Sequence, residues 1–279
     1  MIPPIASQFV AGETVPAALE HAQQMNDDDV QIILNLLGEH YDDPESARAD
    51  ANVYLDLIKD IADTDVEACI SMKPSQIGLD VSEALFRDNL TTVVAAADER
   101  DVFVWVDMED SSTTDITLDA FQDLAEEFPW NIGICLQSNL KRTRNDLKRI
   151  ADVPGSIRIV KGAYDEPSEV SYTKKQRVDE AYRNDISFLF KHRSRGIAVA
   201  THDPQMIEHT RDLANKHGGD YEIQMLMGVR EDAQRDLASQ GIEVWQYAPY
   251  GSKWFSYFYR RIRERKENLL FAFRAVIGR

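Results

Sequence analysis

Short apolar segments and longer amphipathic segments alternate along the chain. The apolar segments are nearly continuous, which is typical of strands that are buried on both faces of a parallel sheet. Eight such segments can be distinguished, and they span residues 30–37, 66–72, 102–108, 131–137, 156–162, 196–202, 221–227 and 241–247. The pattern therefore predicts repeated strand–helix units.

Helix start and stop residues mark the segments between the predicted strands. Asp43–Pro44 places an N-cap residue before a proline at the first helical position, and Asp203–Pro204 repeats this arrangement. Asp80 and Glu83 form a variant of the capping box at the start of another helix. The helix that follows Pro204 ends on a pair of glycines, the usual stop.

A strand followed by a helix, eight times over about 250 residues, predicts a closed (β/α)8 barrel. The alternative is an open doubly wound sheet, but no Gly-x-Gly-x-x-Gly follows the first strand. Residues 1–29 predict a helical extension that caps the lower end of the barrel or packs on its side, and residues 30–279 predict the barrel. The beginning of the chain lacks the basic and then apolar order of a signal peptide.

The charge of the chain is strongly negative. Asp and Glu number 48 against 31 Lys and Arg, a net charge of −17. This argues against nucleic acid as a partner, because phosphate binding needs a basic surface. The excess fits an ordinary acidic enzyme and equally a protein adapted to a salt-rich cytosol. Cys69 and Cys135 lie in apolar segments and predict free thiols in a reducing cytoplasm, and no Cys/His spacing predicts a metal site.

Polar residues collect at the ends of the predicted strands, where barrel enzymes place their chemistry. One such residue alone would more simply begin a solvated loop. Seven strands carry them, which favours a common site on one rim: Lys73, Asp107, Gln137, Arg158 with Lys161–Gly162, Thr201–His202, Gln224 and Tyr247.

The segment YFYRRIRER, residues 257–265, concentrates positive charge in this acidic chain. Helical spacing places Tyr257, Arg260, Arg261 and Glu264 on one face of a predicted amphipathic helix. Two arginines that face one glutamate have spare capacity for an anion, and guanidinium groups bind carboxylates in bidentate fashion. A solvated face with Arg–Glu pairs is the alternative. A role in the site requires this helix to lie over the barrel mouth.

Several segments carry a family resemblance. They are RIVKGAYDEP (158–167), VWQYAPYG (244–251) followed by YFYRRIRE (257–264), and the shorter ISMKPSQIG, VDMED, ATHDP, YEIQMLMGV and FVAGETV. Together they resemble the motifs of the proline dehydrogenase family, in its short monofunctional form, from about residue 9 to residue 267. Asp165 stands where many members of that family carry Trp, which bears on how the adenine end of the cofactor is held.

The resemblance implies a flavin enzyme. Its reaction would be the oxidation of L-proline to Δ1-pyrroline-5-carboxylate, with hydride transfer to N5 of non-covalent FAD, as the first step of proline catabolism to glutamate. The implied catalytic residues are Lys73, Asp107, Tyr247 and Arg158. The implied substrate-binding residues are Lys73, Tyr247, Tyr257, Arg260, Arg261 and Glu264. The implied cofactor-binding residues are Gln137, Arg158, Val160, Lys161, Gly162, Ala163, Thr201, His202, Gln224 and Leu226.

The resemblance also implies partners. A quinone acceptor would require transient membrane contact, for which the apolar residues 269–277 are one candidate, although a closing helix packed on the barrel explains them as well. The expected location is the cytoplasm, peripheral to the inner face of the membrane, with a pyrroline-5-carboxylate dehydrogenase as a further partner. Two other classes remain open: a Schiff-base lyase that uses Lys161 or Lys73, and a carboxylate-binding barrel without turnover.

Overall fold

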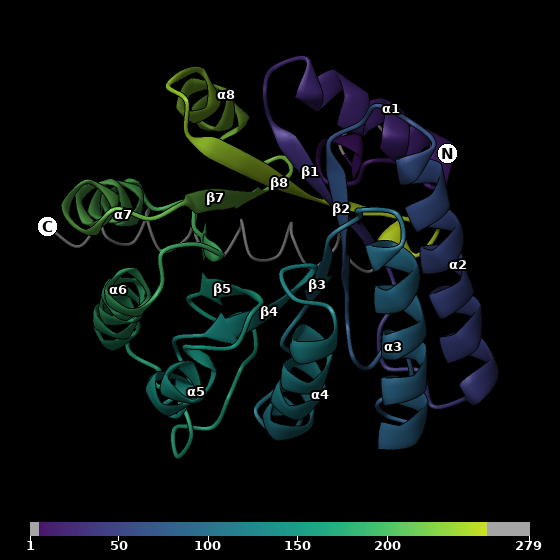
Figure 1. The fold of residues 1–279 in the computed structure, drawn as a ribbon, viewed down its shortest axis with the longest axis horizontal. Coiled ribbons are helices and arrows are strands. Elements are labelled where there is room, and N and C mark those ends of the chain that lie inside the picture. Colours follow the sequence, from purple (N-terminus) through teal and green to yellow (C-terminus); the bar gives the residue numbers. More distant parts are fainter. Residues whose placement is uncertain (1–5, 256–279) are drawn as a thin grey trace, which may run out of the picture.

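Eight parallel strands close into one barrel in chain order (Figure 1). This computed structural model describes residues 6–255. The strands are β1 (Gln31–Leu36), β2 (Ala68–Met72), β3 (Val104–Val106), β4 (Ile132–Gln137), β5 (Ser156–Val160), β6 (Ile197–Ala200), β7 (Tyr221–Leu226) and β8 (Glu243–Tyr250). β8 pairs with β1, so the sheet has no free edge. The predicted (β/α)8 barrel is confirmed.

Helices follow one another around the outside of the strands (Figure 1). They are α1 (Val15–Asn26), α2 (Pro44–Ala62), α3 (Glu83–Asp98), α4 (Thr114–Glu127), α5 (Thr143–Ile150), α6 (Lys175–His192), α7 (Pro204–His217) and α8 (Glu231–Ser239), after a short 3-10 turn, η1 (Ala6–Gln8). The helix predicted to follow β8 and to lie over the barrel mouth falls outside the described residues.

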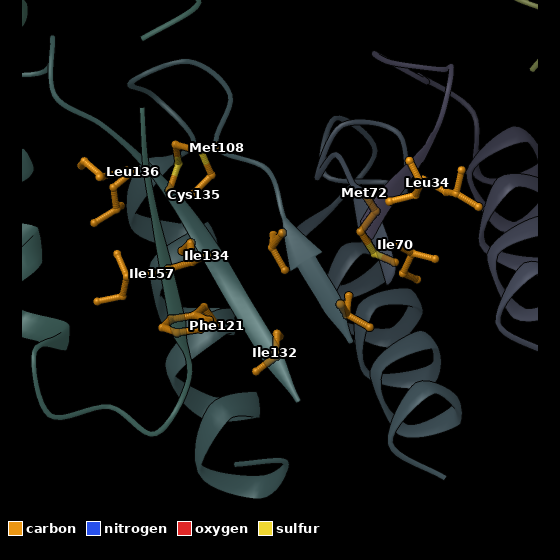
Figure 2. Close-up of a cluster of buried hydrophobic side chains, with 14 of the residues drawn as sticks. Leu34, Ile70, Met72, Met108, Phe121, Ile132, Ile134, Cys135, Leu136 and Ile157 are labelled. Carbon is orange, nitrogen blue, oxygen red and sulfur yellow. The ribbon is translucent and has the colours of Figure 1, made fainter. Parts of the chain in front are cut away.

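Alternate residues of each strand face two different interiors. The outward residues are mostly aliphatic, with Gln246 and Tyr250 of β8 as exceptions, and they pack with the inner faces of the helices into one continuous core. Figure 2 shows part of this core, with Ile70 and Met72 of β2, Ile132 and Ile134 of β4, and Phe121 of α4. The inward residues form a separate and smaller cluster, in which Ile33, Cys69, Trp105 and Ala198 pack with partly buried aromatic rings. The strands are therefore covered on both faces, as their continuous apolar pattern predicts.

The helix caps follow the sequence in two places and depart from it in one. Asp43 accepts a hydrogen bond from the Ser46 backbone N–H at 2.7 Å, and Asp203 accepts one from the Gln205 N–H at 3.0 Å. The expected Asp80 cap is wrong. α3 begins at Glu83 with Ser82 as its N-cap, because the Asp80 carboxylate is engaged by His40 at 2.8 Å.

The helix α1 lies on the outer side of the seam between β8 and β1 (Figure 1). Its buried residues Ala18, Ala22 and Met25 belong to the outer core, and His21 Nε2 lies 2.7 Å from Gln246 Oε1 of β8. Of the two placements expected for the N-terminal extension, the structure therefore has the one on the side of the barrel. The domain boundary at residue 29 stays a prediction.

Residues 6–255 contain neither a candidate membrane-spanning helix nor a candidate metal site. None of the described helices is both long and apolar enough to cross a membrane. Within the same residues, no three side chains of His, Cys, Asp or Glu gather into a possible metal site.

Candidate active site

A buried ion pair stands on the barrel axis near the carboxyl ends of the strands. Arg158 points inward from the middle of β5, and its side chain is only 3% exposed. Asp107, the residue after β3, is 14% exposed and bonds to Arg158 Nη2 through Oδ1. The two residues are 51 positions apart in the chain, so only the closure of the barrel brings them together.

Two hydroxyl groups complete the shell around Asp107. Ser71 of β2 donates its hydroxyl hydrogen to Asp107 Oδ1 at 2.8 Å, and the Tyr247 phenol of β8 donates to Oδ2 at 2.7 Å. Both carboxylate oxygens therefore have donors. Burial, and after it the charge of Asp107, raise the pKa of Tyr247 well above its usual value. Tyr247 consequently remains a neutral phenol that donates.

The opposite side of Arg158 is held by an amide. Arg158 Nη1 donates to Gln224 Oε1 of β7 at 3.2 Å, and Gln224 Nε2 donates to Glu222 Oε1 at 2.5 Å. The guanidinium carbon lies 4.8 Å from the centre of the Trp105 ring, within cation–π distance. Arg158 thus has hydrogen-bond partners at both Nη atoms and an aromatic ring against its face.

The charge of Arg158 is secure despite its burial. Burial acts to lower the pKa of the guanidinium, but the surrounding groups, Asp107 among them, outweigh it and raise the pKa above its usual value. Arginine therefore provides a fixed positive charge in a region that excludes water. A fixed charge of this kind can stabilise negative charge that develops on a bound molecule.

A second group lies at the rim beside β1, β2 and β3. Lys73, just after β2, donates to Asn35 Oδ1 at 3.2 Å, and Asn35 is itself buried and donates to the Ser71 carbonyl at 2.8 Å. Glu109 accepts from the Ser75 backbone N–H at 2.7 Å and from its hydroxyl at 2.8 Å. Burial raises the pKa of Glu109 against these hydrogen bonds. The rim here combines one amine with fixed polar partners.

A third group joins the ends of β4 and β5. Gln137 donates through Nε2 to the Glu109 carbonyl at 2.6 Å and accepts from the Ala163 N–H at 3.0 Å. Gly162 has φ of +125°, and a Cβ at this position would lie 2.2 Å from Asn139 Oδ1. The turn after Val160 consequently requires glycine. Gln137, Gly162 and Ala163, predicted separately from the sequence, are brought together.

The remaining predicted residues lie at the ends of β5, β6 and β7. Lys161 Nζ bonds to Asp179 at 2.6 Å and to Asp203 at 3.0 Å. His202 Nε2 accepts from the Leu226 N–H at 3.3 Å, which ties the loop after β6 to β7. The Thr201 N–H donates to the Gln224 carbonyl at 3.0 Å. The contacts of Thr201 and His202 link β6 to β7, whereas those of Lys161 link the end of β5 to α6 and to the start of α7.

Four predicted site residues lie outside the described residues: Tyr257, Arg260, Arg261 and Glu264. The structure also adds residues that the sequence reasoning did not single out, namely Asn35, Ser71, Trp105 and Glu222. The period of two along a strand indicated three of these residues, because residues two apart point to the same face. Ser71 lies two residues before Lys73, Trp105 two before Asp107, and Glu222 two before Gln224, so each pair shares the inner face.

Comparison with known proteins agrees with the family resemblance of the sequence motifs over nearly the whole chain. The family model described as "Proline dehydrogenase" matches residues 18–273. "Proline dehydrogenase" of Deinococcus radiodurans is 36% identical over 282 residues, covering 98% of this chain and 90% of that protein. "Proline dehydrogenase 2" of Bacillus subtilis (strain 168) is 33% identical over 276 residues, covering 97% and 90%.

A solved structure shares the fold. It is proline utilization A (PutA) from Bdellovibrio bacteriovorus inactivated by N-propargylglycine, with a TM-score of 0.85 at 24% identity. The match covers 92% of this chain and 32% of that one, so the barrel corresponds to about a third of the larger protein. The family model and the curated relatives extend over the strands that carry the axial ion pair and the rim groups, and the chain belongs to the proline dehydrogenase family.

Proposed function

We propose that the protein oxidises L-proline to Δ1-pyrroline-5-carboxylate with FAD as the hydride acceptor at N5. Membership of the family makes it an oxidoreductase of proline catabolism, acting in the first step. The finer proposal concerns the cofactor, the direction of hydride transfer and the residues responsible. Its main support is the buried cation Arg158, held on the barrel axis by Asp107 and Gln224.

The residues present fit a flavin. Gly162 has a positive φ and lies directly against the Asn139 side chain, so the turn after β5 brings its backbone and the Asn139 amide together at the rim. Asn139 Oδ1 is buried and accepts no hydrogen bond from the described part of the chain. Arg158 and Lys161 supply positive charge at the same rim. FAD supplies the two-electron acceptor, and we propose that these residues and Gln137, Val160, Ala163, Thr201, His202, Gln224 and Leu226 hold it.

The role of Arg158 follows from its fixed charge. A two-electron acceptor gains negative charge when it takes a hydride, and a cation held nearby favours that change. Asp107 holds the guanidinium rather than acting as a base, because both of its oxygens already accept hydrogen bonds from Arg158, Ser71 and Tyr247. We therefore assign Asp107 an electrostatic and positioning role.

The substrate carboxylate needs its own cations. Lys73 stands at the rim near β1 with its amine held by Asn35, and we propose that it contacts the carboxylate from this side. Arg260 and Arg261 would bind it from the other side, with Tyr247, Tyr257 and Glu264 shaping the pocket around the ring. Two arginines and a lysine would fix the orientation of the reacting carbon, which lowers the entropic part of the barrier.

The geometry disfavours Schiff-base chemistry at Lys161. Burial acts to lower the pKa of its amine, but the hydrogen bonds that the amine donates to Asp179 and Asp203 outweigh it and raise the pKa. A nucleophilic lysine needs the opposite shift, so that the neutral amine is available at neutral pH. We therefore regard Lys161 as a charged residue that binds the cofactor.

Electrons must leave the reduced cofactor, and the product must be consumed. We propose a quinone as the acceptor, with transient contact of the protein at the inner face of the membrane. The product is a cyclic imine that opens to an aldehyde, so an aldehyde-oxidising dehydrogenase specific for pyrroline-5-carboxylate is the natural next enzyme. With these partners, we propose that the protein acts in the cytoplasm, peripheral to the inner face of the membrane.

The decisive experiment is anaerobic reduction. The protein is purified with added FAD, excess cofactor is removed, and L-proline is added without oxygen while the absorbance near 450 nm is followed. We expect a yellow protein that bleaches with L-proline and not with D-proline. A colourless preparation that stays inert after reconstitution with FAD would overturn the proposal.

The carboxylate role is tested by Arg260→Met with Arg263→Met as the matched control, because Arg263 is off the predicted polar face. Loss of a charge-assisted contact of about 1.5–3 kcal/mol should raise the KM for proline roughly tenfold to a hundredfold while the yellow colour stays. The Arg263 variant should keep the wild-type KM. An unchanged KM for Arg260→Met would show that this arginine does not bind the substrate.

A further inference from the structure

One acidic residue inside the barrel has no part in the chemistry proposed above. Glu222 is the second residue of β7 and faces the same interior as Gln224, two residues further on. Its carboxylate accepts the hydrogen bond from Gln224 Nε2 at 2.5 Å. Through Gln224 it is connected to Arg158, the central cation of the site.

The polarity of this chain of contacts is fixed at both ends. A guanidinium can only donate hydrogen bonds, so Arg158 requires the oxygen of the Gln224 amide. The amide nitrogen then points down the barrel and needs an acceptor, because an unsatisfied donor in such surroundings is costly. Glu222 is the acceptor that the structure provides. Removal of its carboxyl group would leave Gln224 free to turn away from Arg158.

We propose that Glu222 is a positioning residue for Arg158: through Gln224 it holds the Nη1 side of the guanidinium, as Asp107 holds the Nη2 side. Arg158 is thereby clamped between two carboxyl groups on opposite strands of the barrel. The contact with Asp107 is direct, whereas the one with Glu222 passes through an amide that can rotate. The clamp sets the orientation of the Arg158 guanidinium toward the carboxyl ends of the strands.

The clamp has a titratable end that lies toward the opposite face of the barrel. A cleft of about 470 Å³ opens there, lined by Cys69, Phe103, Glu243 and Trp245 among others. Glu222 pairs in register with Glu243, one of the lining residues. Glu222 itself is only partly enclosed, so protons can reach it from this face while substrate and cofactor occupy the mouth.

The charged groups that face Glu222 come from several strands. The charge of Glu243 on β8 raises the pKa of Glu222, and the charge of Arg158 on β5 lowers it. The other two neighbours are uncharged: Cys69 of β2 is a neutral thiol, and Ala198 of β6 is the residue that pairs in register with Glu222. Burial, opposed by the Gln224 hydrogen bond and assisted by Glu243, raises the pKa of Glu222 to about 8. The carboxyl group is mostly neutral at pH 7 and becomes negative in mildly alkaline solution.

The test uses FAD-loaded protein and the variants Glu222→Gln, Glu222→Ala and Glu243→Gln. The readout is the equilibrium between oxidised and reduced flavin against a reference dye, from pH 6 to pH 9.5. Glu222→Ala should make reduction about tenfold less favourable at pH 7, the effect of one weakened hydrogen bond to a charged group. Glu222→Gln keeps an acceptor for Gln224, so it should match the wild type at pH 7.

The pH profile separates positioning from general damage. In the wild type, ionisation of Glu222 adds negative charge beside Arg158, and reduction should become less favourable by an additional step near pH 8. This step should be absent in Glu222→Gln. It should remain in Glu243→Gln but move to lower pH, because Glu243 helps to raise the pKa of Glu222 while its own carboxylate accepts from Trp245 Nε1 and not from Gln224. Wild-type behaviour of Glu222→Ala at pH 7, or an unchanged step in Glu222→Gln, would overturn the proposal.

A second readout is independent of the proposed function, on which the flavin measurement rests. The folded protein keeps the Glu222 proton up to about pH 8, whereas an unfolded chain loses it near the ordinary value of 4.5. The stabilisation from this proton is full below pH 4.5 and is lost as the pH rises to 8. The thermal midpoint of FAD-free wild type should fall over this window relative to Glu222→Gln. If the thermal midpoints of the two proteins changed with pH in parallel, the proposal would be overturned, even if flavin reduction by proline failed. If Glu222→Ala does not fold, the comparison of wild type with Glu222→Gln decides.

Discussion

On β5, Ile157 and Ile159 point outward to the helices, whereas Arg158 between them points to the axis. Ile157 and Ile159 are fully buried among aliphatic side chains, and their apolar contacts require neither a charged partner nor a particular contact direction. Arg158 is almost as deeply buried, but it needs an acceptor at each Nη atom. Neighbouring positions of one strand thus serve two interiors, one that contributes stability and one that organises charge.

The difference also explains where each interior obtains its specificity. The outer core tolerates exchange of one aliphatic residue for another of similar volume, because its attraction has no direction. The inner cluster around Arg158 depends on hydrogen bonds between residues of β2, β5, β7 and β8 and the residue after β3, each at a defined distance. Substitutions at the axis should therefore change activity more than stability, and those in the outer core should do the reverse.

The largest expected effect is that of Arg158→Lys. Lysine keeps the charge but cannot bond to Asp107, Ser71 and Gln224 together, so we expect kcat for proline oxidation to fall by roughly 100-fold to 1000-fold. The matched control is Arg193→Lys. Arg193 is also buried, but it donates to the Ala151 and Val153 carbonyls behind α5, so its loss should lower the thermal midpoint and leave kcat unchanged. Equal losses of kcat in both variants would abolish the distinction between the two interiors.

The outer core is tested by Ile159→Ala. This side chain is fully buried between β5 and the helices, and its truncation should cost about 2–5 kcal/mol of unfolding free energy. The quantity is measured by urea unfolding, and kcat is measured on the folded fraction at low temperature. A kcat below half of the wild-type value there would mean that the outer core also holds the site in place.

The smallest of the three effects is expected for Tyr247→Phe. Loss of its hydrogen bond to Asp107 should lower kcat/KM about tenfold, as for one contact with a charged group. Tyr182→Phe is the control, since the Tyr182 hydroxyl donates to the Ala200 carbonyl on the outer side at 2.9 Å. The control should lose a little stability and keep kcat/KM. If the two variants exchanged these outcomes, the axial role of Tyr247 would be wrong.

The sequence predicted the barrel because the relevant information is local. Each strand is a short continuous apolar segment, and the caps at Asp43 and Asp203 and the stop at Gly218 can be read within a few residues. The strand ends were also close: β8 extends to Tyr250, three residues beyond the predicted end at Tyr247, because it continues its pairing with β1 up to Leu36. The length of such pairing depends on the partner strand and is not encoded in one segment.

The contacts of the site were harder to predict, because they join residues that lie far apart in the chain. Arg158, Asp107 and Tyr247 were selected as residue types near strand ends, but the direction in which each side chain bonds depends on strand register and barrel closure. Glu222 illustrates this: the period of two places it on the same face as Gln224, but only the contact of Gln224 with Arg158 shows that the Gln224 amide needs an acceptor there. The capping error at Asp80 has a related cause, since its partner His40 lies 40 residues away.

The position of α1 at the seam has a consequence for how the chain is made. Its inner face is completed by β8, and the hydrogen bond from the Ala11 N–H to the Pro249 carbonyl closes the same seam at 2.8 Å. The helix α1 leaves the ribosome long before β8, so the part of its inner face that packs on β8 is covered only once that strand has been made. Until then the nascent protein exposes a small apolar stripe, which is the kind of surface that chaperones bind during synthesis.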